Sequence, residues 1–475
     1  MDHAAATGSA LALILRSFLI DTKLADLPDP IRAPSPVSPP LWRQLQLTAV
    51  ALASIRSGVS GSVAFEAVDP ALRPGVQALG FQVLRWLGRA EALRRQLAKR
   101  TPPPAADALL CTALALAWDA ALSPYEPFTL VDQAVEAAKR NPGTRAQASF
   151  INACLRRFLR ERDELVAATE REPVAQWNHP RWWIERLRRD HPRDWQRVLA
   201  ADNTQGPMTL RVNTRKTDVA AYRRALEAVN LQAVPVAASG LQLLGARPVQ
   251  ALPGFAEGEC SVQDAAAQLA APLLLEGLQG AAPLRVLDAC AAPGGKTAHL
   301  LEVAGPDAIE LTALEIDAGR SRRIDETLAR LGLAAKVLVA DAARPKQWWD
   351  GQAFDAILLD APCTASGIVR RHPDVRWLRR ESDTEQLALQ QAMLLAALWP
   401  LVRSGGRLLY CTCSVFREEG THQIDAFLAH NTDARLLPSP GHLLPQSGGI
   451  ARGVPDNALG DHDGFFYALL EKQPR

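Results

Sequence analysis

The spacing of apolar residues changes along the chain, and the changes divide it into regions with different expected folds. Between residues 41 and 165, apolar residues recur every three or four positions, as in VQALGFQVLRWLGRAEALRRQLA, and short glycine or proline breaks separate the runs. This period places apolar side chains on one face of a helix. We therefore expect residues 41–165 to form an all-α domain of several packed helices.

The pattern becomes mixed after this region and then alternates regularly. Residues 166–258 combine helical runs with short strand-like segments such as MTLRV, which predicts a small α+β subdomain. In residues 259–475, helical segments separate the short apolar runs LRVLDAC, ELTALEID, KVLVAD, FDAILLDA and GRLLYCTC. Apolar strands that alternate with helices are typical of a parallel, doubly wound, Rossmann-like α/β domain.

The first 40 residues are expected to be an extension outside these domains. Pro28–Pro40 holds six prolines in thirteen residues, which predicts a linker or an extended arm. The apolar run Leu11–Ile20 is too short for a membrane span and contains Arg16. A surface helix is therefore expected there rather than a secretory signal.

Charge and cysteine usage narrow the class of protein. The net charge is only +2, so any contact with nucleic acid must come from local basic patches. The seven cysteines are odd in number and spread over a long chain, which does not suit a disulfide framework. Free thiols indicate a reducing compartment, so we expect a cytoplasmic protein without a membrane anchor. We also expect a monomer, since nothing in the sequence calls for further assembly.

A glycine-rich turn follows the first predicted strand of the α/β domain. Its residues are Cys290, Ala291, Ala292, Pro293, Gly294, Gly295 and Lys296. The glycines allow a tight turn against a ligand, and the next helix directs its N-terminus at the same place. A phosphate-binding loop would need glycine where Cys290 stands, and the G-x-G-x-x-G fingerprint of dinucleotide sites is absent. Nucleoside triphosphates and NAD are therefore poor candidates.

Acidic residues close four successive predicted strands, at Asp288, Glu315, Asp341 and Asp360. Glu315 follows the glycine turn by about 20 residues, the position from which an acid contacts ribose hydroxyls in doubly wound folds. A single acid at such a position could simply cap a helix. Four acids in register with a glycine turn favour a nucleoside site with little positive charge, which suits S-adenosylmethionine, a sulfonium cation without phosphates.

Two cysteines stand after neighbouring predicted strands, and we expect them to face the same crevice as the cofactor. Cys363 lies in DAPCTASG and Cys413 in YCTCS. A zinc site would need a second ligand pair, and a redox pair would have C-x-x-C spacing. Buried, inert thiols suit Cys411 better than the other two. A thiolate, a second thiol and Asp360 are the groups that methylation of cytosine carbon 5 requires, because addition to carbon 6 activates carbon 5.

The motifs CAAPGGKT, LLDAPCTASGIVRRHPD, TCS and GDHDGFFYALL resemble those of the RNA (cytosine-5)-methyltransferase family, Sun/Fmu type. The helical region resembles the NusB-like RNA-binding domain of that family, with FINACLRRF similar to its last helix. The resemblance extends from about residue 41 to the end of the sequence. It implies an S-adenosylmethionine-dependent enzyme that methylates carbon 5 of a cytosine in 16S rRNA.

The resemblance also implies roles for single residues. Cys413 would attack cytosine carbon 6, Cys363 would assist product release, and Asp360 would contact the base. Residues Cys290 to Lys296, Glu315, Asp341 and Asp360 would bind the cofactor, and no metal is implied. This sequence departs from the family at Gly420, where relatives often have asparagine, so contacts behind the nucleophile are expected to differ.

Basic residues next to Cys363 are candidates for RNA binding. Five arginines with interleaved aromatic residues occupy this segment: Arg370, Arg371, Arg376, Arg379 and Arg380. Arginine beside aromatic rings suits phosphate contacts and base stacking, although a solvated helix face is the alternative. Arg156 and Arg157 form a second candidate patch in the helical region, partly neutralised by Glu161.

Other functions remain open on the sequence alone. The same chemistry could act on tRNA. A non-catalytic ribosome-assembly factor would not need Cys413, Cys363 and Asp360 together. Methylation of an amino group would favour an Asn/Asp-Pro-Pro-aromatic segment, and the chain has Asp360-Ala361-Pro362-Cys363 there.

Overall fold

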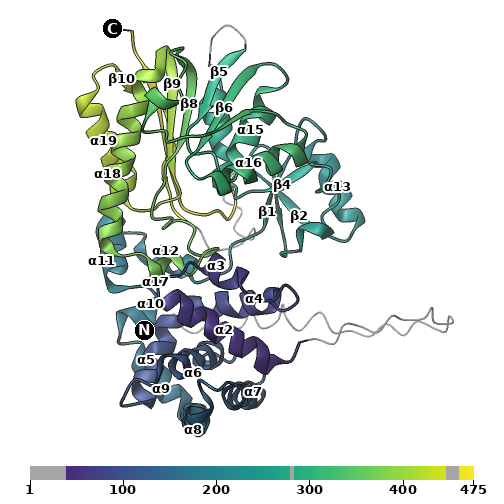
Figure 1. The fold of residues 1–475 in the computed structure, drawn as a ribbon, viewed down its shortest axis with the longest axis vertical. Helices are drawn as coiled ribbons and strands as arrows, with labels where there is room; N and C mark the ends of the chain where they lie inside the picture. The colour runs from purple at the N-terminus through teal and green to yellow at the C-terminus, as the bar shows by residue number, and fades with distance from the viewer. Residues whose placement is uncertain (1–38, 279–282, 446–458, 475) are drawn as a thin grey trace, which may run out of the picture. The chain divides into compact units, whose positions relative to one another are not determined.

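The computed structural model describes residues 39–278, 283–445 and 459–474. The chain forms two compact units, Met1–Gln176 and Trp177–Arg475 (Figure 1). The expected surface helix at Leu11–Ile20 and almost all of the proline-rich segment lie outside the described residues. Within the described part, no helix combines the length and the apolar character needed to cross a bilayer.

The first unit is helical, as the three- and four-residue spacing predicts. Its helices are α2 (Leu41–Arg56), α3 (Gly61–Glu66), α4 (Arg73–Arg85), α5 (Leu87–Leu97), α6 (Pro104–Ala117), α7 (Pro127–Arg140), α8 (Ala148–Arg160), α9 (Arg162–Thr169) and α10 (Pro173–Trp177). Every residue of α6 from Ala106 to Ala117 is buried. This helix packs against α2, α4, α5, α7 and α8. A helix that is apolar on all sides must lie at the centre of a bundle, and α6 does so.

The second unit begins with two short helices and a small antiparallel sheet. The helices are α11 (Arg181–Asp190) and α12 (Trp195–Asp202), and α13 (Val219–Ala228) packs on the sheet. The strand order is β2 (Ala233–Val236), β3 (Gly240–Leu243), β1 (Thr209–Val212) and β4 (Cys260–Val262). Because β4 pairs with β1, the small sheet takes an edge strand from beyond the expected boundary at residues 258 and 259.

The large sheet contains eight strands among the described residues, in the order β10, β12, β9, β8, β5, β6, β7, with β11 paired to β12. Their bounds are β5 (Leu284–Asp288), β6 (Ile309–Glu315), β7 (Lys336–Val339), β8 (Phe354–Asp360), β9 (Val402–Thr412), β10 (Ala434–Leu436), β11 (Gly441–Leu443) and β12 (Phe465–Lys472). Strands β5 to β9 are parallel, which confirms the doubly wound fold. Strand β12 is antiparallel to β9, a feature that the apolar run FFYALL does not reveal.

Helices cover both faces of this sheet, as Figure 1 shows. On one face, α14 (Ala270–Leu275), α15 (Gly295–Ala304) and α16 (Ala318–Leu331) bury Val286, Leu311 and Leu358. On the other, α18 (Glu381–Leu398) and α19 (Thr421–His430) bury Leu287 and Ile357. Alternate residues of each strand therefore enter different cores. The chain order reverses between β5 and β8, and a crevice beyond the carboxyl ends at such a point is where doubly wound folds bind ligands.

Candidate active site

The glycine-rich turn joins β5 to α15 at the switch point of the sheet. Gly294 has a left-handed φ of 95°, and a Cβ atom on it would lie 3.0 Å from Cα of Ile324. The amide of Ala291 donates to the carbonyl of Leu314 at 2.9 Å, which ties the turn to β6. The peptide between Ala292 and Pro293 is cis. Only glycine fits at position 294, because both the backbone conformation and the close packing exclude a side chain.

Asp288, at the end of β5, is bonded to the helix that follows this turn. Its side chain is buried and accepts a hydrogen bond of 2.7 Å from the hydroxyl of Thr297 in α15. Burial raises the pKa of Asp288 to about 7, and the hydrogen bond from Thr297 opposes part of that rise. Asp288 therefore contributes to the position of α15 rather than to an exposed binding surface.

Replacing Asp288 by asparagine is expected to remove a pH dependence of stability. The folded protein keeps a proton on Asp288 at pH values where the unfolded chain, with a pKa of about 3.9, has lost it. The contribution of this group to the free energy of unfolding is therefore present below about pH 4 and falls as the pH rises toward about 7. Because asparagine does not titrate, the stability of the variant relative to the wild type should increase from about pH 5 to about pH 8 in urea denaturation. A constant difference over this range would contradict the raised pKa.

The acids at the carboxyl ends of β6 and β7 hold local structure. Glu315 ends β6, is 3% exposed, and accepts a 3.1 Å hydrogen bond from the amide of Asp317. Asp341 lies two residues beyond β7 and accepts a 2.9 Å hydrogen bond from the amide of Ala343. Both acids thus bond to the backbone of the following turn, as expected if they only cap local structure. They also stand at the carboxyl ends of neighbouring strands, as expected of a nucleoside site.

Asp360 connects the glycine-rich turn to strands β8 and β9. One carboxylate oxygen lies 2.6 Å from Nζ of Lys296, and the thiol of Cys411 lies 3.5 Å from the other. Burial lowers the pKa of Lys296, but the charge of Asp360 outweighs it, and the pKa is raised above its usual value. Lys296 is therefore held as an ammonium ion against Asp360. Cys411, for which the sequence implies no role, contacts the same carboxylate.

The structure brings together the two cysteines that were expected to share a crevice. Sγ of Cys363 lies 3.4 Å from Sγ of Cys413, although 50 residues separate them along the chain. The hydrogen bond with Cys413 and the burial of the side chain raise the pKa of Cys363 well above its ordinary value. Cys363 is therefore kept as a thiol that can donate to Cys413.

A direct backbone crossing holds the segment that carries Cys363. The amide of Gly367 donates to the carbonyl of Cys413 at 2.9 Å, and the amide of Gly464 donates to the carbonyl of Gly367 at 2.8 Å. A Cβ atom on Gly367 would lie 2.1 Å from the carbonyl oxygen of Gly464. The two chain segments therefore touch main chain to main chain. No group of three or more His, Cys, Asp or Glu side chains suited to a metal ion occurs within residues 39–278, 283–445 and 459–474.

Comparison with known protein families gives three matches along the chain. Residues 277–471 match the model of the 16S rRNA methyltransferase RsmB/F. Residues 179–250 match the ferredoxin-like domain of RsmF/B-like methyltransferases, and residues 52–160 match the NusB family. The ribosomal RNA small subunit methyltransferase B of Pseudomonas putida is 40% identical over 440 residues, which cover 89% of this chain and 97% of that protein. The chain belongs to the RsmB/F methyltransferase family.

Further relatives agree with this assignment. The ribosomal RNA small subunit methyltransferase B of Pseudomonas syringae pv. tomato is 42% identical, with 83% of this chain and 88% of that protein covered. The crystal structure of PH0851 has a TM-score of 0.70 and 26% identity, and covers 90% of this chain and 99% of that chain. A methyltransferase homolog protein from Pyrococcus horikoshii has a TM-score of 0.51 and 27% identity over 63% of this chain and 97% of that chain. The expected NusB-like and Rossmann-like domains are thereby confirmed.

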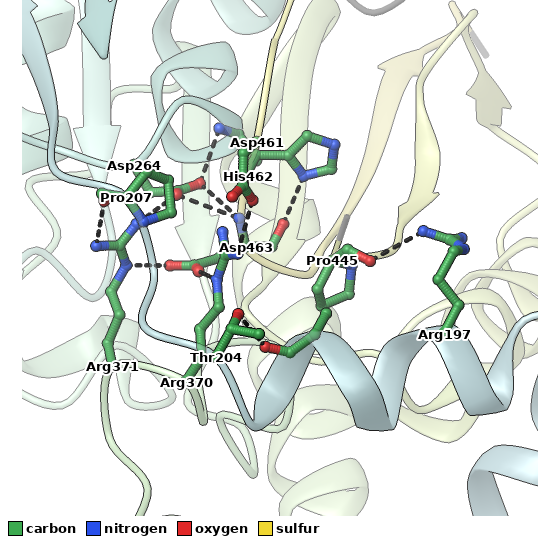
Figure 2. Close-up of polar contacts among 12 residues, drawn as sticks. Arg197, Thr204, Pro207, Asp264, Arg370, Arg371, Pro445, Asp461, His462 and Asp463 are labelled. Carbon is green, nitrogen blue, oxygen red and sulfur yellow. Dashed lines mark hydrogen bonds and ion pairs between the residues drawn. The ribbon is translucent and has the colours of Figure 1, made fainter. Parts of the chain in front are cut away.

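Two arginines expected to bind RNA in this RsmB/F methyltransferase are fully buried instead. Arg370 is 0% exposed and pairs with Asp461 at 2.6 Å and with Asp463 (Figure 2). Arg376 is also 0% exposed, and its guanidinium donates to the carbonyls of Asn178 and Asp202 and to the side chain of Asn203. Their burial does not fit the prediction that they contact RNA. Removal of either arginine would leave buried partner groups without their hydrogen bonds and so destabilise the fold.

Arg371 belongs to the same network and is only partly exposed. Its guanidinium pairs with Asp463 and Asp264 and donates to the carbonyl of Pro207 at 2.8 Å, as Figure 2 shows. The segment after Cys363, the segment before β12 and the start of the α/β domain are thereby joined. This position also favours structural support over RNA contact.

The remaining basic candidates keep exposed surface. Arg379 is half-buried and donates to the carbonyls of Cys363 and Thr364, whereas Arg380 is exposed. In the first unit, Arg156 and Arg157 are exposed on α8, and Arg157 also pairs with Glu161 at 2.8 Å. These arginines remain candidates for RNA binding.

Sequence reasoning missed the polar residues behind the two cysteines. Thr364, Ser366, Ser414 and Glu419 are all fully buried there and bonded to one another. Thr364 and Ser414 could have been found, because each directly follows a candidate cysteine. Glu419 sits in a polar run that reads as an exposed turn, so its burial has no signal in the sequence. Behind it, a Cβ atom at Gly420 would lie 2.6 Å from the ring of His442, so asparagine would not fit there without moving that ring.

Proposed function

We propose that this protein transfers the methyl group of S-adenosylmethionine to carbon 5 of a specific cytosine in 16S rRNA. The observation that carries the proposal is the pair of thiols, 3.4 Å apart, beyond the carboxyl ends of β8 and β9. Asp360 lies at the end of β8 and is bonded to the glycine-rich turn through Lys296. The family model, whose description names 16S rRNA, and the small-subunit names of the relatives support 16S rRNA as the substrate. This substrate fits a cytoplasmic protein.

The residues at the switch point fit the proposed cofactor. The turn from Cys290 to Lys296 offers a close backbone approach, and Glu315, Asp341 and Asp360 offer carboxylates for hydroxyl groups and positive charge. Lys296 is already neutralised by Asp360, which suits a ligand without phosphates. When bound, S-adenosylmethionine supplies an electrophilic methyl group.

The chain's own residues would carry out the remaining steps. Cys413, as thiolate, adds to carbon 6 of the cytosine, which makes carbon 5 nucleophilic. Asp360 holds the proton at ring nitrogen N3 and so stabilises the addition. After methylation, the electron pair of the bond from carbon 5 to its proton forms the double bond to carbon 6, and the bond from carbon 6 to Cys413 breaks. The Cys363 thiol gives its proton to the departing sulfur of Cys413 and then, as thiolate, takes up the proton lost from carbon 5. The base must leave any stack to reach these groups.

RNA contacts would come from arginines of both units that keep some exposed surface. We propose Arg379, Arg380, Arg156 and Arg157 as contacts for phosphate groups, since they keep exposed surface where Arg370 and Arg376 do not. Each such contact adds to affinity and to its salt dependence without specifying sequence. A monomer is sufficient for this arrangement.

The proposed function is tested by incubating the protein with methyl-labelled S-adenosylmethionine and unmodified 16S rRNA, 23S rRNA or tRNA. Label recovered as 5-methylcytosine at a single 16S position is the expected result. Label in tRNA alone would support the methylation reaction but overturn the assignment of 16S rRNA as the substrate. Binding of S-adenosylmethionine without label in any RNA would overturn the proposed reaction and favour a role in ribosome assembly.

Replacing Cys363 by alanine is expected to trap the protein on its RNA. The variant keeps Cys413, so addition and methyl transfer continue, but product release loses its assisting group. A covalent protein–RNA adduct that survives denaturing gel electrophoresis should accumulate with 16S rRNA and S-adenosylmethionine, while turnover falls by about 10² or more. The double variant Cys363→Ala, Cys413→Ala is the control and should form no adduct. Turnover of Cys363→Ala at the wild-type rate, without accumulation of adduct, would contradict the role of Cys363.

A further inference from the structure

Glu419 is a buried carboxylate that the reaction described above does not use. It is 0% exposed and accepts hydrogen bonds from the amide of Thr364 at 2.8 Å and from its hydroxyl at 2.5 Å. It also accepts from the hydroxyl of Ser414 at 2.6 Å and from the side-chain amide of Gln391 at 3.2 Å. Four donors on one buried carboxylate form a fully satisfied site.

The donors come from the two segments that carry the reactive cysteines. Thr364 directly follows Cys363, and Ser414 directly follows Cys413. The same carboxylate oxygen, Oε2, accepts from both hydroxyls. Glu419 therefore connects the two segments beyond the ends of β8 and β9, in addition to the backbone bond from Gly367 to Cys413.

The backbone of Glu419 is itself fixed to the large sheet. Its carbonyl oxygen lies 2.8 Å from the hydroxyl of Tyr410 and 3.3 Å from that of Thr412, both in β9. The hydroxyl of Ser366 adds a second link, because it lies 2.8 Å from the hydroxyl of Ser414 and accepts from the amide of Val415. The carboxylate is thus held against a rigid strand.

The charge state of Glu419 follows from its partners. Burial raises the pKa of its carboxyl group, and the hydrogen bonds from Ser414, Thr364 and Gln391 act in the opposite direction. All of these partners donate, so the acceptor-only carboxylate matches them better than a protonated acid or an amide would. Glutamine at this position would direct an NH₂ group at another donor.

We propose that Glu419 is a positioning residue that sets the separation of the Cys363 and Cys413 sulfur atoms. The effect of this positioning on catalysis rests on the proposed function, because addition by Cys413 and release assisted by Cys363 must occur at the same base. Its consequence for the geometry of the free protein does not. The two can therefore be tested separately.

The matched pair of variants is Glu419→Gln and Glu418→Gln. Both residues lie in the same short 3₁₀ turn, Arg417–Glu419, and both changes remove one negative charge. Glu418 is 32% exposed and pairs with Arg186 in α11. Only the Glu419 change alters the hydrogen bonds to Thr364 and Ser414.

The first measurement needs no RNA and reports the distance between the sulfur atoms. The oxidant diamide accepts two electrons and two protons from the thiols of Cys363 and Cys413, which form an S–S bond, while diamide becomes the hydrazine. The sulfurs need to approach from 3.4 Å to about 2.05 Å. Peptide mass mapping of the Cys363–Cys413 linkage over time should show similar rates for wild type and Glu418→Gln, and a rate lower by about 10-fold for Glu419→Gln, since a hydrogen bond to a charged group is lost.

The second measurement follows methylation of 16S rRNA. Glu419→Gln is expected to lower kcat by about 10-fold, to leave KM for S-adenosylmethionine unchanged and to accumulate covalent adduct. Wild-type protein that methylates no RNA, combined with slow oxidation of Glu419→Gln, would overturn the proposed function and leave the positioning role intact. Oxidation of Glu419→Gln at the wild-type rate would overturn the positioning role.

A milder variant covers the case in which Glu419→Gln does not fold. Ser414→Ala removes one of the four donors and leaves the carboxylate and both contacts with Thr364 in place. Its oxidation should be slower than wild type by about threefold, a part of the effect expected for Glu419→Gln. A wild-type rate of linkage in Ser414→Ala would overturn the proposal as well.

Discussion

Cys413→Ala is expected to lower methylation of 16S rRNA by at least about 10³-fold, because loss of a covalent nucleophile removes the whole reaction path. The initial rate of label transfer from S-adenosylmethionine measures the effect. Binding of S-adenosylmethionine, followed by calorimetry, should stay within about twofold of wild type, because Cys413 does not belong to the glycine-rich turn. The loss should therefore appear in kcat rather than in cofactor affinity.

Cys411→Ala is the control for Cys413→Ala, since the two thiols are separated by a single residue. Cys411 is 0% exposed in β9 and contacts Asp360 through its thiol. Its loss is expected to cost no more than about 10-fold in rate, the effect of one weak hydrogen bond to a carboxylate that keeps Lys296. If Cys413→Ala were active and Cys411→Ala inactive, the nucleophile would be Cys411 in β9, and the proposed mechanism would be contradicted.

Arg370→Ala is expected to give the largest loss of stability. Arg370 is 0% exposed and is bonded to Asp463 at 2.5 Å and to Asp461 at 2.6 Å. Truncation leaves the buried carboxylate of Asp463 and the partly exposed one of Asp461 with less compensation, which costs about 3–5 kcal/mol. Urea denaturation should show this as a lower midpoint for the transition of the second unit.

Arg380→Ala is the matched control for Arg370→Ala, because Arg380 is exposed in the same basic segment. Its free energy of unfolding should stay within about 0.5 kcal/mol of wild type. If Arg380→Ala weakens RNA binding while Arg370→Ala acts only on stability, the basic segment has two separate roles. Equal stability of the two variants would contradict the structural role of Arg370.

The sequence predicted the fold and the cysteine pair because both follow from local patterns. Apolar strands alternating with helices specify a doubly wound sheet, and neighbouring parallel strands bring their carboxyl ends together. Cys363 and Cys413 follow such strands, so their proximity needed no knowledge of side-chain packing. The antiparallel β12 was not predicted, because strand direction depends on the path of the preceding chain.

The basic segment after Cys363 shows where sequence reasoning fails. Arg370 and Arg371 read as a nucleic-acid patch because their partner Asp463 stands more than 90 residues away in the chain. Side-chain partners at that separation cannot be inferred from composition or spacing. The same limit hides Glu419, whose burial depends on Thr364 from another segment.

The crossing of Gly367 and Gly464 restricts how this protein can diverge. A methyl group at Gly367 would lie 2.1 Å from the carbonyl oxygen of Gly464, and one at Gly464 would lie 2.5 Å from the side chain of Val415. Alanine is not tolerated at Gly367 or at Gly464 alone. Alanine at both positions would add to the crowding, because the two main chains already touch. Mutational libraries of this enzyme should therefore keep both glycines even where neighbouring positions accept many residues.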